Sequence, residues 1–399
     1  MVSPQFVRVE QIRAEHIPPG KLTCVVYGPG HGEAILVVFP DGKVGVVDGC
    51  AAHNIDPVFQ LLQEIQQQLI QAGRPFEIRF VALTHPHEDH YLGLAELIEY
   101  FRPHIKLLST VLLLSARGKK GLLDWLELKI SKGGLPPDGL CLRGLSRVVA
   151  AIRKEESARP VDNLCAKLAM VELSDCGGAT LEIYGCGPAH VDVARGLENL
   201  VADAENMGNT GVSILEHDPN ATSGALLLQW GQARVLLAGD LTCHGELTSS
   251  WHSAATLPRL KHHVQVVNVA HHASAEAHHE VLWNTIGPQL AVVTPFRGAG
   301  GPNPPRPEMI EKLVKSGSRV VITTPPAWVG ESGVKVVPTS PVMPIPQKSV
   351  IRSKILSGKA PRLAKKERVH NAVMFSLDAE GNITDVVLAG DAAEYVVVG

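Results

Sequence analysis

The sequence has no hydrophobic run long enough to cross a membrane. A membrane-spanning helix needs roughly 20 consecutive apolar residues, and no stretch of the 399 residues approaches that length. Residues 1–5 also lack the charged segment followed by an apolar core that marks a secretory signal. We therefore expect a cytoplasmic protein with no membrane partner.

The sequence also lacks closely spaced cysteine pairs and a large net charge of either sign. The seven cysteines form an odd set without any C-x-x-C spacing, which argues against a zinc ribbon and against a disulfide framework. The net charge of −3 provides no global basic field for coating nucleic acid. Any contact with nucleic acid must therefore be local. Apolar residues, at 45 %, are sufficient for a large core.

One short segment concentrates possible metal ligands. It reads THPHEDHYLG, directly after a short apolar run and before an apolar helical pattern. Its four ligand-type side chains are His85, His87, Asp89 and His90. A strand that ends in such a turn can direct the first two toward one metal ion and the last two toward a second. A helix cap would require only one such residue, so the spacing predicts a binuclear site.

Two later strand ends carry further ligand-type side chains. Asp240 closes the apolar run 235–239, and a carboxylate there could bridge two metal ions. On its own, an aspartate in this position would more often form a turn. His271 and His272 follow the apolar run 266–270, although an isolated histidine pair is usually solvated. Together with the first segment, these residues extend the predicted metal site.

The hydrophobic pattern alternates strand pairs with helices in two comparable halves. The expected strands are 22–27, 34–39, 44–47, 80–83, 107–114, 180–185, 211–216, 225–230, 234–238, 264–269, 290–293 and 320–323, followed in the tail by 372–377, 386–388 and 395–398. The expected helices are 56–72, 92–100, 122–130, 145–154 and 307–316, with one more between 269 and 290. This order predicts an α/β fold of the αββα sandwich type, in which two sheets pack face to face with helices outside.

Three regions follow from this pattern. We expect residues 1–325 to form the sandwich, with an insertion at about 115–175. Residues 326–370 are expected to be a linker that is rich in proline first and then basic. Its residues 347–370 hold eight Lys or Arg against the single acid Glu367. The basic stretch is either solvated or a contact for a phosphate backbone or a protein partner. Residues 371–399 are expected to form a C-terminal β-hairpin extension.

The order of the motifs, HxHxDH, then GD, then HH, each at a strand end, resembles the metallo-β-lactamase superfamily. Within it, the chain is most similar to the hydrolase domain of ComEC-type DNA-uptake proteins and their free-standing relatives. Residues 28–36 resemble that family's GQGD-type turn, 47–49 its DGG turn, 209–213 its N-x-x-S strand and 271–274 its HHGS segment. The similarity covers roughly residues 22–325, apart from the expected insertion.

The resemblance implies roles for the candidate ligands. His85 and His87 would hold the first metal ion, Asp89 and His90 the second, and Asp240 would bridge the two. A histidine from the HH pair would complete the second site.

Which histidine of the pair binds metal stays open. Either His271 or His272 would be the ligand, and the other would contact the scissile phosphate or protonate the leaving group. The catalytic residues implied by the resemblance are therefore Asp89, His271 and His272. The residues that would support the ligands by hydrogen bonds are Asp48, Asn209 and Ser274.

Three positions depart from the family pattern or leave it undecided. His190, in a PAH turn, is either the third histidine of the first metal ion or an ordinary loop residue. Ala273 stands where the family has glycine, which narrows the backbone freedom after the histidines. Arg306 replaces a histidine and would bring a fixed positive charge near the substrate pocket, where it could favour phosphate.

The implied chemistry is metal-dependent hydrolysis. Two divalent ions, zinc or manganese, would lower the pKa of a bridging water, whose hydroxide attacks in line, and would clamp the substrate oxygen on which charge accumulates. Mixed nitrogen and oxygen ligands also admit iron. The leading substrate is a phosphodiester, such as single-stranded DNA or a nucleotide, which would make the chain a phosphodiesterase or nuclease. Because the fold does not fix the substrate, the alternatives are a carboxylic-ester or lactone hydrolase and a partner-regulated effector of defence or toxin type.

Overall fold

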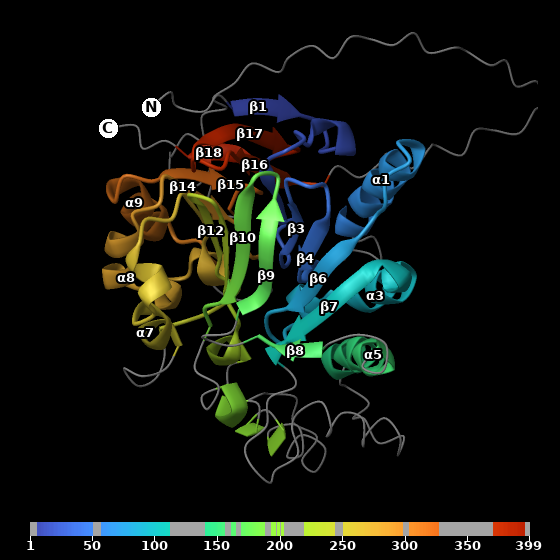
Figure 1. The fold of residues 1–399 in the computed structure, drawn as a ribbon. Helices are drawn as coiled ribbons and strands as arrows, with labels where there is room; N and C mark the ends of the chain where they lie inside the picture. The colour runs from blue at the N-terminus through green and yellow to red at the C-terminus, as the bar shows by residue number, and fades with distance from the viewer. Residues whose placement is uncertain are drawn as a thin grey trace, which may run out of the picture.

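Two β-sheets lie face to face in the computed structural model, and helices cover their outer faces (Figure 1). The structure describes residues 6–50, 57–111, 140–155, 161–164, 169–187, 193–196, 198–199, 201–202, 219–243, 250–297, 303–326 and 370–395. The expected αββα sandwich is therefore confirmed. Within these residues, no helix is both long and apolar enough to cross a membrane.

The first sheet has nine described strands in the order β1-β17-β16-β2-β3-β4-β6-β7-β8. Their bounds are β1 (Phe6–Val9), β2 (Leu22–Tyr27), β3 (Ala34–Val38), β4 (Val44–Val47), β6 (Ile78–Leu83), β7 (Ile105–Thr110), β8 (Val161–Asn163), β16 (Ala372–Leu377) and β17 (Ile383–Ala389). The short strand β5 (Gly49–Cys50) follows β4. The strands β4, β6, β7 and β8 run parallel to one another.

Helices α1 (Pro57–Gln71), α3 (Leu94–Phe101) and α5 (Leu140–Glu155) cover the outer face of this sheet (Figure 1). Helix α1 buries Val58, Leu61, Leu62, Ile65 and Leu69. Their spacing of three or four residues places them on one side of the helix, which is why the sequence pattern located this helix closely. The single-turn helix α2 (Glu88–Tyr91) lies inside the ligand-rich segment.

The second sheet has eight described strands in the order β18-β15-β14-β13-β12-β11-β10-β9. Their bounds are β9 (Ala169–Cys176), β10 (Ala179–Gly185), β11 (Leu226–Trp230), β12 (Ala233–Leu237), β13 (Val266–Asn268), β14 (Leu290–Val293), β15 (Arg319–Ile322) and β18 (Ala393–Tyr395). The helices on its outer face are α7 (Ser250–Ala255), α8 (Glu280–Ile286) and α9 (Pro307–Lys315) (Figure 1). The described 3-10 helices are η1 (Ala14–His16), η2 (Arg102–His104), η4 (Pro219–Thr222), η5 (Pro258–Lys261), η6 (Ala270–Ala273) and η7 (Ala275–Ala277).

The C-terminal strands belong to both sheets. All six residues of β16 are buried, and this strand pairs with β2 on one side and β17 on the other. Strand β18 borders β15 in the second sheet, where the sequence suggested a strand at 395–398. The sequence suggested residues 371–399 as an extension. Strands from this segment instead join both sheets, because their side chains are buried in the core.

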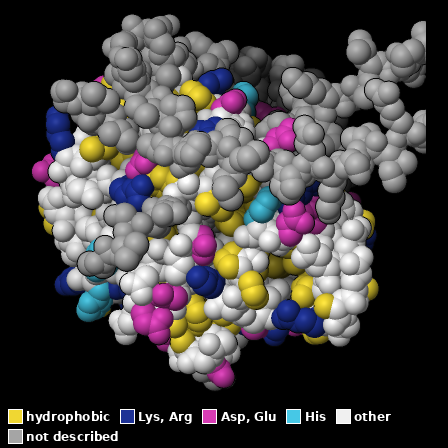
Figure 2. Space-filling model, turned by 90° about the horizontal axis from the view of Figure 1, so that it is seen from above, with side chains coloured by type: hydrophobic (Ala, Val, Ile, Leu, Met, Phe, Trp, Pro, Cys, Tyr) yellow, Lys and Arg dark blue, Asp and Glu magenta, His cyan; other side chains and the backbone are white. Residues whose placement is uncertain are grey.

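Other expected elements have mixed outcomes. The strand expected at 107–114 ends at Thr110 in β7, and the sequence pattern did not reveal β1, β8 or β9. The strand expected at 211–216, the helix expected at 122–130 and nearly all of the linker expected at 326–370 lie outside the described residues. In Figure 2, basic and acidic side chains are interspersed on the described surface seen from above, as the small net charge leads one to expect.

Candidate metal centre

The carboxyl ends of the parallel strands place the ligand-type side chains at one edge of the sandwich. Strand β6 leads into the segment with His85 and His90, β12 leads to Asp240, and β13 leads to His272. Parallel strands deliver the residues that follow them to the same edge of a sheet. One edge of each sheet therefore contributes to a single cluster.

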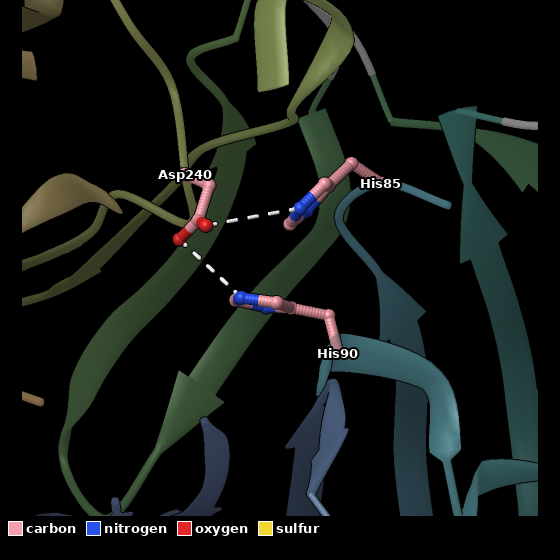
Figure 3. Close-up of side chains that lie close together, drawn as sticks. All are labelled: His85, His90 and Asp240. Atoms are coloured by element: carbon pink, nitrogen blue, oxygen red, sulfur yellow. Dashed lines mark ion pairs between the residues drawn. The ribbon is translucent and has the colours of Figure 1, made fainter. Parts of the chain in front are cut away.

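His85, His90 and Asp240 lie at the centre of this cluster, and both imidazoles point at the carboxylate (Figure 3). The distance from His85 Nε2 to Asp240 Oδ2 is 3.9 Å, and that from His90 Nε2 to Asp240 Oδ1 is 3.3 Å. All three side chains are buried. The two oxygens of Asp240 therefore face different histidines.

His272 and Asp89 complete the cluster on the other side of Asp240. His272 Nε2 lies 3.6 Å from Asp89 Oδ2 and 3.6 Å from Asp240 Oδ2, while His90 Nε2 lies 3.9 Å from Asp89 Oδ2. His271, His272 and Ala273 all have left-handed backbone angles, with φ of 47°, 56° and 61°. This unusual turn, which costs a non-glycine residue roughly 1–2 kcal/mol per position, turns His272 inward.

The second ring nitrogen of each buried histidine already has a partner. His90 Nδ1 donates to Asp48 Oδ2 at 2.8 Å, and His272 Nδ1 donates to the Thr294 carbonyl oxygen at 2.6 Å. Thr84 Oγ1 donates to Asp48 at 2.6 Å, so it accepts from His85 Nδ1 at 3.0 Å. In each neutral ring, a proton on Nδ1 leaves a lone pair on Nε2.

Those lone pairs have no hydrogen-bond partner among the described residues. The Nε2 atoms of His85, His90 and His272 are all buried and unpartnered, although buried polar atoms are nearly always satisfied. Three groups of side chains present ligand atoms within 4.8 Å of one another: His85, His90 and Asp240; Asp89, His90 and His272; Glu33, Asp48 and His90. Imidazole nitrogens and carboxylate oxygens are the donors that zinc and manganese accept, so these residues fit divalent cations.

The pKa values in the cluster reflect mutual compensation of charge. Burial works against a charged His90, but Asp240, Asp89 and Asp48 outweigh it and raise the pKa of His90 well above the usual range. Burial likewise opposes the charge of Asp240, yet His90 and His272 hold the pKa of that carboxyl well below its usual range. Cations bound here would replace these protons, so metal affinity depends on pH.

His271 belongs to none of the three groups of possible ligands. Its Nε2 accepts a hydrogen bond from Asn220 Nδ2 at 3.1 Å, and its Nδ1 lies 3.0 Å from Ser274 Oγ. Ser274, expected to support the ligands, thus supports His271. Of the two histidines between which the sequence left the choice open, His272 is the one that the structure places against Asp89 and Asp240.

The remaining expected site residues lie apart from the cluster or outside the described residues. His87 is half-buried, with its ring centroid 5.1 Å from that of His85, and belongs to none of the three groups. Arg306 is exposed at the start of α9. His190 and Asn209 lie outside the described residues.

Glu33 is a buried carboxylate that the sequence analysis did not single out. It accepts hydrogen bonds from Thr294 Oγ1 at 2.8 Å and from Asn268 Nδ2 at 3.0 Å. Burial raises its pKa to about 7. Glu33 thereby links the strand end that holds His272 to the turn at the start of β3. A charged residue directly before an apolar strand was the signal available in the sequence.

An aromatic and basic group borders the cluster. Phe296 stacks on His272, with ring centroids 5.3 Å apart and an interplanar angle of 29°. The exposed His31 ring meets Phe296 edge to face at 5.2 Å. The exposed Arg297 follows, and its backbone N–H donates to the Gly30 carbonyl oxygen at 2.8 Å.

Similarity to solved structures is weak in sequence. The chain is 11 % identical to the metallo-β-lactamase fold protein YhfI from Bacillus subtilis, covering 76 % of this chain and 96 % of that one, with a TM-score of 0.34. The chain is 12 % identical to the short form of human tRNase Z, and the match covers 68 % of this chain and 92 % of that one, with a TM-score of 0.32. The chain is 15 % identical to a mutant of the CmlA β-hydroxylase, with a TM-score of 0.32. That match covers 70 % of this chain and 46 % of the other, so this chain spans less than half of that protein.

No curated protein matches the chain. The family model of the metallo-β-lactamase superfamily, in contrast, matches residues 28–276. The match includes His85, His90, Asp240 and His272, and it covers more than half of the sequence. The chain therefore belongs to the metallo-β-lactamase superfamily.

Proposed function

We propose that this superfamily hydrolase is a two-metal phosphodiesterase that acts on single-stranded DNA or a nucleotide. The observation that carries the proposal is the convergence of three buried, unpartnered Nε2 atoms on the carboxylates of Asp89 and Asp240. Buried polar atoms without a partner destabilise a fold. Structural stability therefore does not explain why three such nitrogens lie together, whereas metal binding does.

Each ligand has a proposed role. His85 and His87 would hold one divalent ion, and Asp89 and His272 would hold the other together with His90. Asp240 would be shared by the two ions, because its two oxygens face different histidines. Zinc and manganese both suit this mixed set of donors.

Bound ions of this kind would supply Lewis-acid activation of a water molecule and of a phosphoryl oxygen. The chain itself fixes the ligands. Asp48 holds His90 directly and His85 through Thr84, and the Thr294 carbonyl holds His272. With each ring fixed in one tautomer, the Nε2 atoms already lie near the carboxylates of Asp89 and Asp240 and need no reorganisation.

The surroundings favour a phosphodiester over an uncharged ester. Arg297 follows Phe296, and Arg306 lies two residues after Pro304, whose carbonyl oxygen accepts from Phe296 N–H. Both side chains are permanently charged, and guanidinium groups pair well with phosphate oxygens. We assign protonation of the leaving oxygen to His271, which adjoins His272 in the sequence and hydrogen-bonds to Asn220 and Ser274. Phe296 offers a flat surface against which a base can stack.

The test is hydrolysis of bis(p-nitrophenyl) phosphate and of end-labelled single-stranded DNA, with added Mn²⁺ or Zn²⁺. We expect turnover that a chelator abolishes and that Asp89→Ala lowers by at least about 100-fold. Asp175→Ala is the matched control, because Asp175 only accepts a hydrogen bond from Gly178 N–H in an exposed turn. Metal content, measured by inductively coupled plasma mass spectrometry, accompanies each assay.

Two outcomes contradict the proposal. If the metal-loaded protein cleaves lactones or carboxylic esters and leaves both phosphodiesters intact, the chain is a hydrolase of the other kind. If the metal-loaded protein turns over none of these substrates, a partner-regulated effector becomes the better explanation. Deletion of residues 348–368 would then show whether a co-purifying protein binds the basic segment.

A further inference from the structure

A cavity of about 690 Å³ opens at the edge of the second sheet opposite the metal centre. Arg234 lines this cavity from the start of β12, whereas Asp240 follows the other end of the same strand. Asp240 is six positions after Arg234, and an extended chain rises about 3.3 Å per residue, so the two residues are at most about 20 Å apart and lie at opposite ends of the strand. The cavity is therefore separate from the metal centre.

Arg234 is a buried cation without a counterion among the described residues. Its side chain is 8 % exposed, and its Nη2 donates to the Arg259 carbonyl oxygen. Its Nε is buried and has no hydrogen-bond partner. In the part of the chain that the structure describes, no carboxylate lies within ion-pair distance of this guanidinium. A buried charge with no compensation is costly, which makes the position unusual.

The neighbouring groups add positive charge. Arg259, which also lines the cavity, lies over the Tyr184 ring with its Cζ 3.2 Å from the centroid. Its Nη1 is 3.6 Å from Glu182 Oε2, so that carboxylate is already paired with Arg259. His262 and His263 line the cavity as well. One carboxylate in this lining, Glu380, is exposed at the hairpin tip between β16 and β17 and is not paired with Arg234.

We propose that this cavity binds a phosphate-bearing small molecule of about nucleotide size. The unpaired charge of Arg234 next to Arg259 suits an oxyanion, because guanidinium groups bind phosphate through paired N–H donors. The volume lies within the range of small-molecule sites, roughly 300–1,000 Å³. The amide side chain of Gln229 lies in the same lining and can contribute a further hydrogen bond.

The experiment measures thermal unfolding and isothermal titration calorimetry with inorganic phosphate, AMP and adenosine at constant ionic strength. Phosphate and AMP are expected to raise the melting temperature by roughly 2 °C or more at saturation, while adenosine, which has no phosphate, does not. Tighter binding of AMP than of phosphate would identify a nucleotide as the ligand. Equal binding would assign the site to the phosphate group alone.

Variants separate this cavity from the metal centre. Arg234→Gln is expected to weaken binding about 10-fold or more, and so is Arg259→Gln, whose side chain is half-exposed and whose replacement leaves the core intact. Arg306→Gln and Asp240→Asn, at the opposite edge, retain the effect. The proposal is overturned if phosphate and AMP give neither a shift nor heat, or if Asp240→Asn removes the effect and both cavity variants keep it.

Discussion

Replacing Asp48 with asparagine would test whether the tautomers of the buried histidines determine metal binding. Asp48 has a left-handed φ of 59°, a conformation that asparagine also tolerates. The carboxylate accepts three hydrogen bonds: from Thr84 N–H at 2.7 Å, from Thr84 Oγ1 at 2.6 Å and from His90 Nδ1 at 2.8 Å. The substitution keeps shape and backbone conformation and removes one acceptor.

Either orientation of the new amide disturbs this arrangement. If its NH₂ group faces His90, Nδ1 must accept a hydrogen bond, so the proton moves to Nε2 and blocks the lone pair that a metal ion needs. If the NH₂ group faces the Thr84 N–H instead, two donors meet in a buried site. Loss of a supporting hydrogen bond to a metal ligand typically costs roughly 10–100-fold in affinity, which corresponds to about 1.4–2.7 kcal/mol.

The assay is competition between the protein and a fluorescent chelator for Zn²⁺ and for Mn²⁺. Asp378→Asn serves as the control, because Asp378 accepts its hydrogen bonds in the exposed β16–β17 turn. Circular dichroism confirms that both variants fold. An Asp48→Asn protein that binds metal as tightly as the wild type would refute the tautomer argument, since the Nε2 lone pair would then be independent of Asp48.

Two further predictions concern the segments around the cluster. Gly32→Ala should lower both the melting temperature and the metal affinity, because an added Cβ would overlap with the Asp89 carbonyl oxygen. The control is Gly20→Ala, which has nearly the same φ and no atom within 4 Å of the added Cβ, and it should keep full metal affinity. An equal loss of metal affinity in both variants would contradict the steric argument. His272→Ala should lose metal by elemental analysis, whereas His271→Ala should retain metal and lose turnover by about 10²–10⁴-fold; equal metal content in both variants would refute this distinction.

The sequence located most of the cluster because its ligands follow strand ends. His85 and Asp240 come within three positions of the end of a buried strand, and His90 lies in the same short segment as His85. A local pattern of this kind is visible in the sequence. The choice between His271 and His272 could not be made in that way. Adjacent residues share one strand end, and three consecutive left-handed residues decide which ring turns inward. Glycine or asparagine at these positions would have indicated a left-handed turn, but the residues are two histidines and an alanine.

Long-range partners were harder to anticipate. Glu33 precedes β3 and meets Thr294 and Asn268 from the second sheet, so only the packing of the two sheets gives it a function. Strands β1 and β17 pair across nearly the whole length of the chain. Sequence patterns show that such segments are strands, but the pairing depends on the tertiary fold.

The position of β16 sets an order for folding during synthesis. This strand lies between β17 and β2, so the hydrogen-bonding edge of β2 has no partner until residues 372–377 have left the ribosome. Unpaired strand edges promote association with other chains. A fragment restricted to the family-matched residues 28–276 lacks β2 as well as β16, so the edge of β3 that pairs with β2 would have no partner. Such a fragment should therefore aggregate although it contains His85, His90, Asp240 and His272.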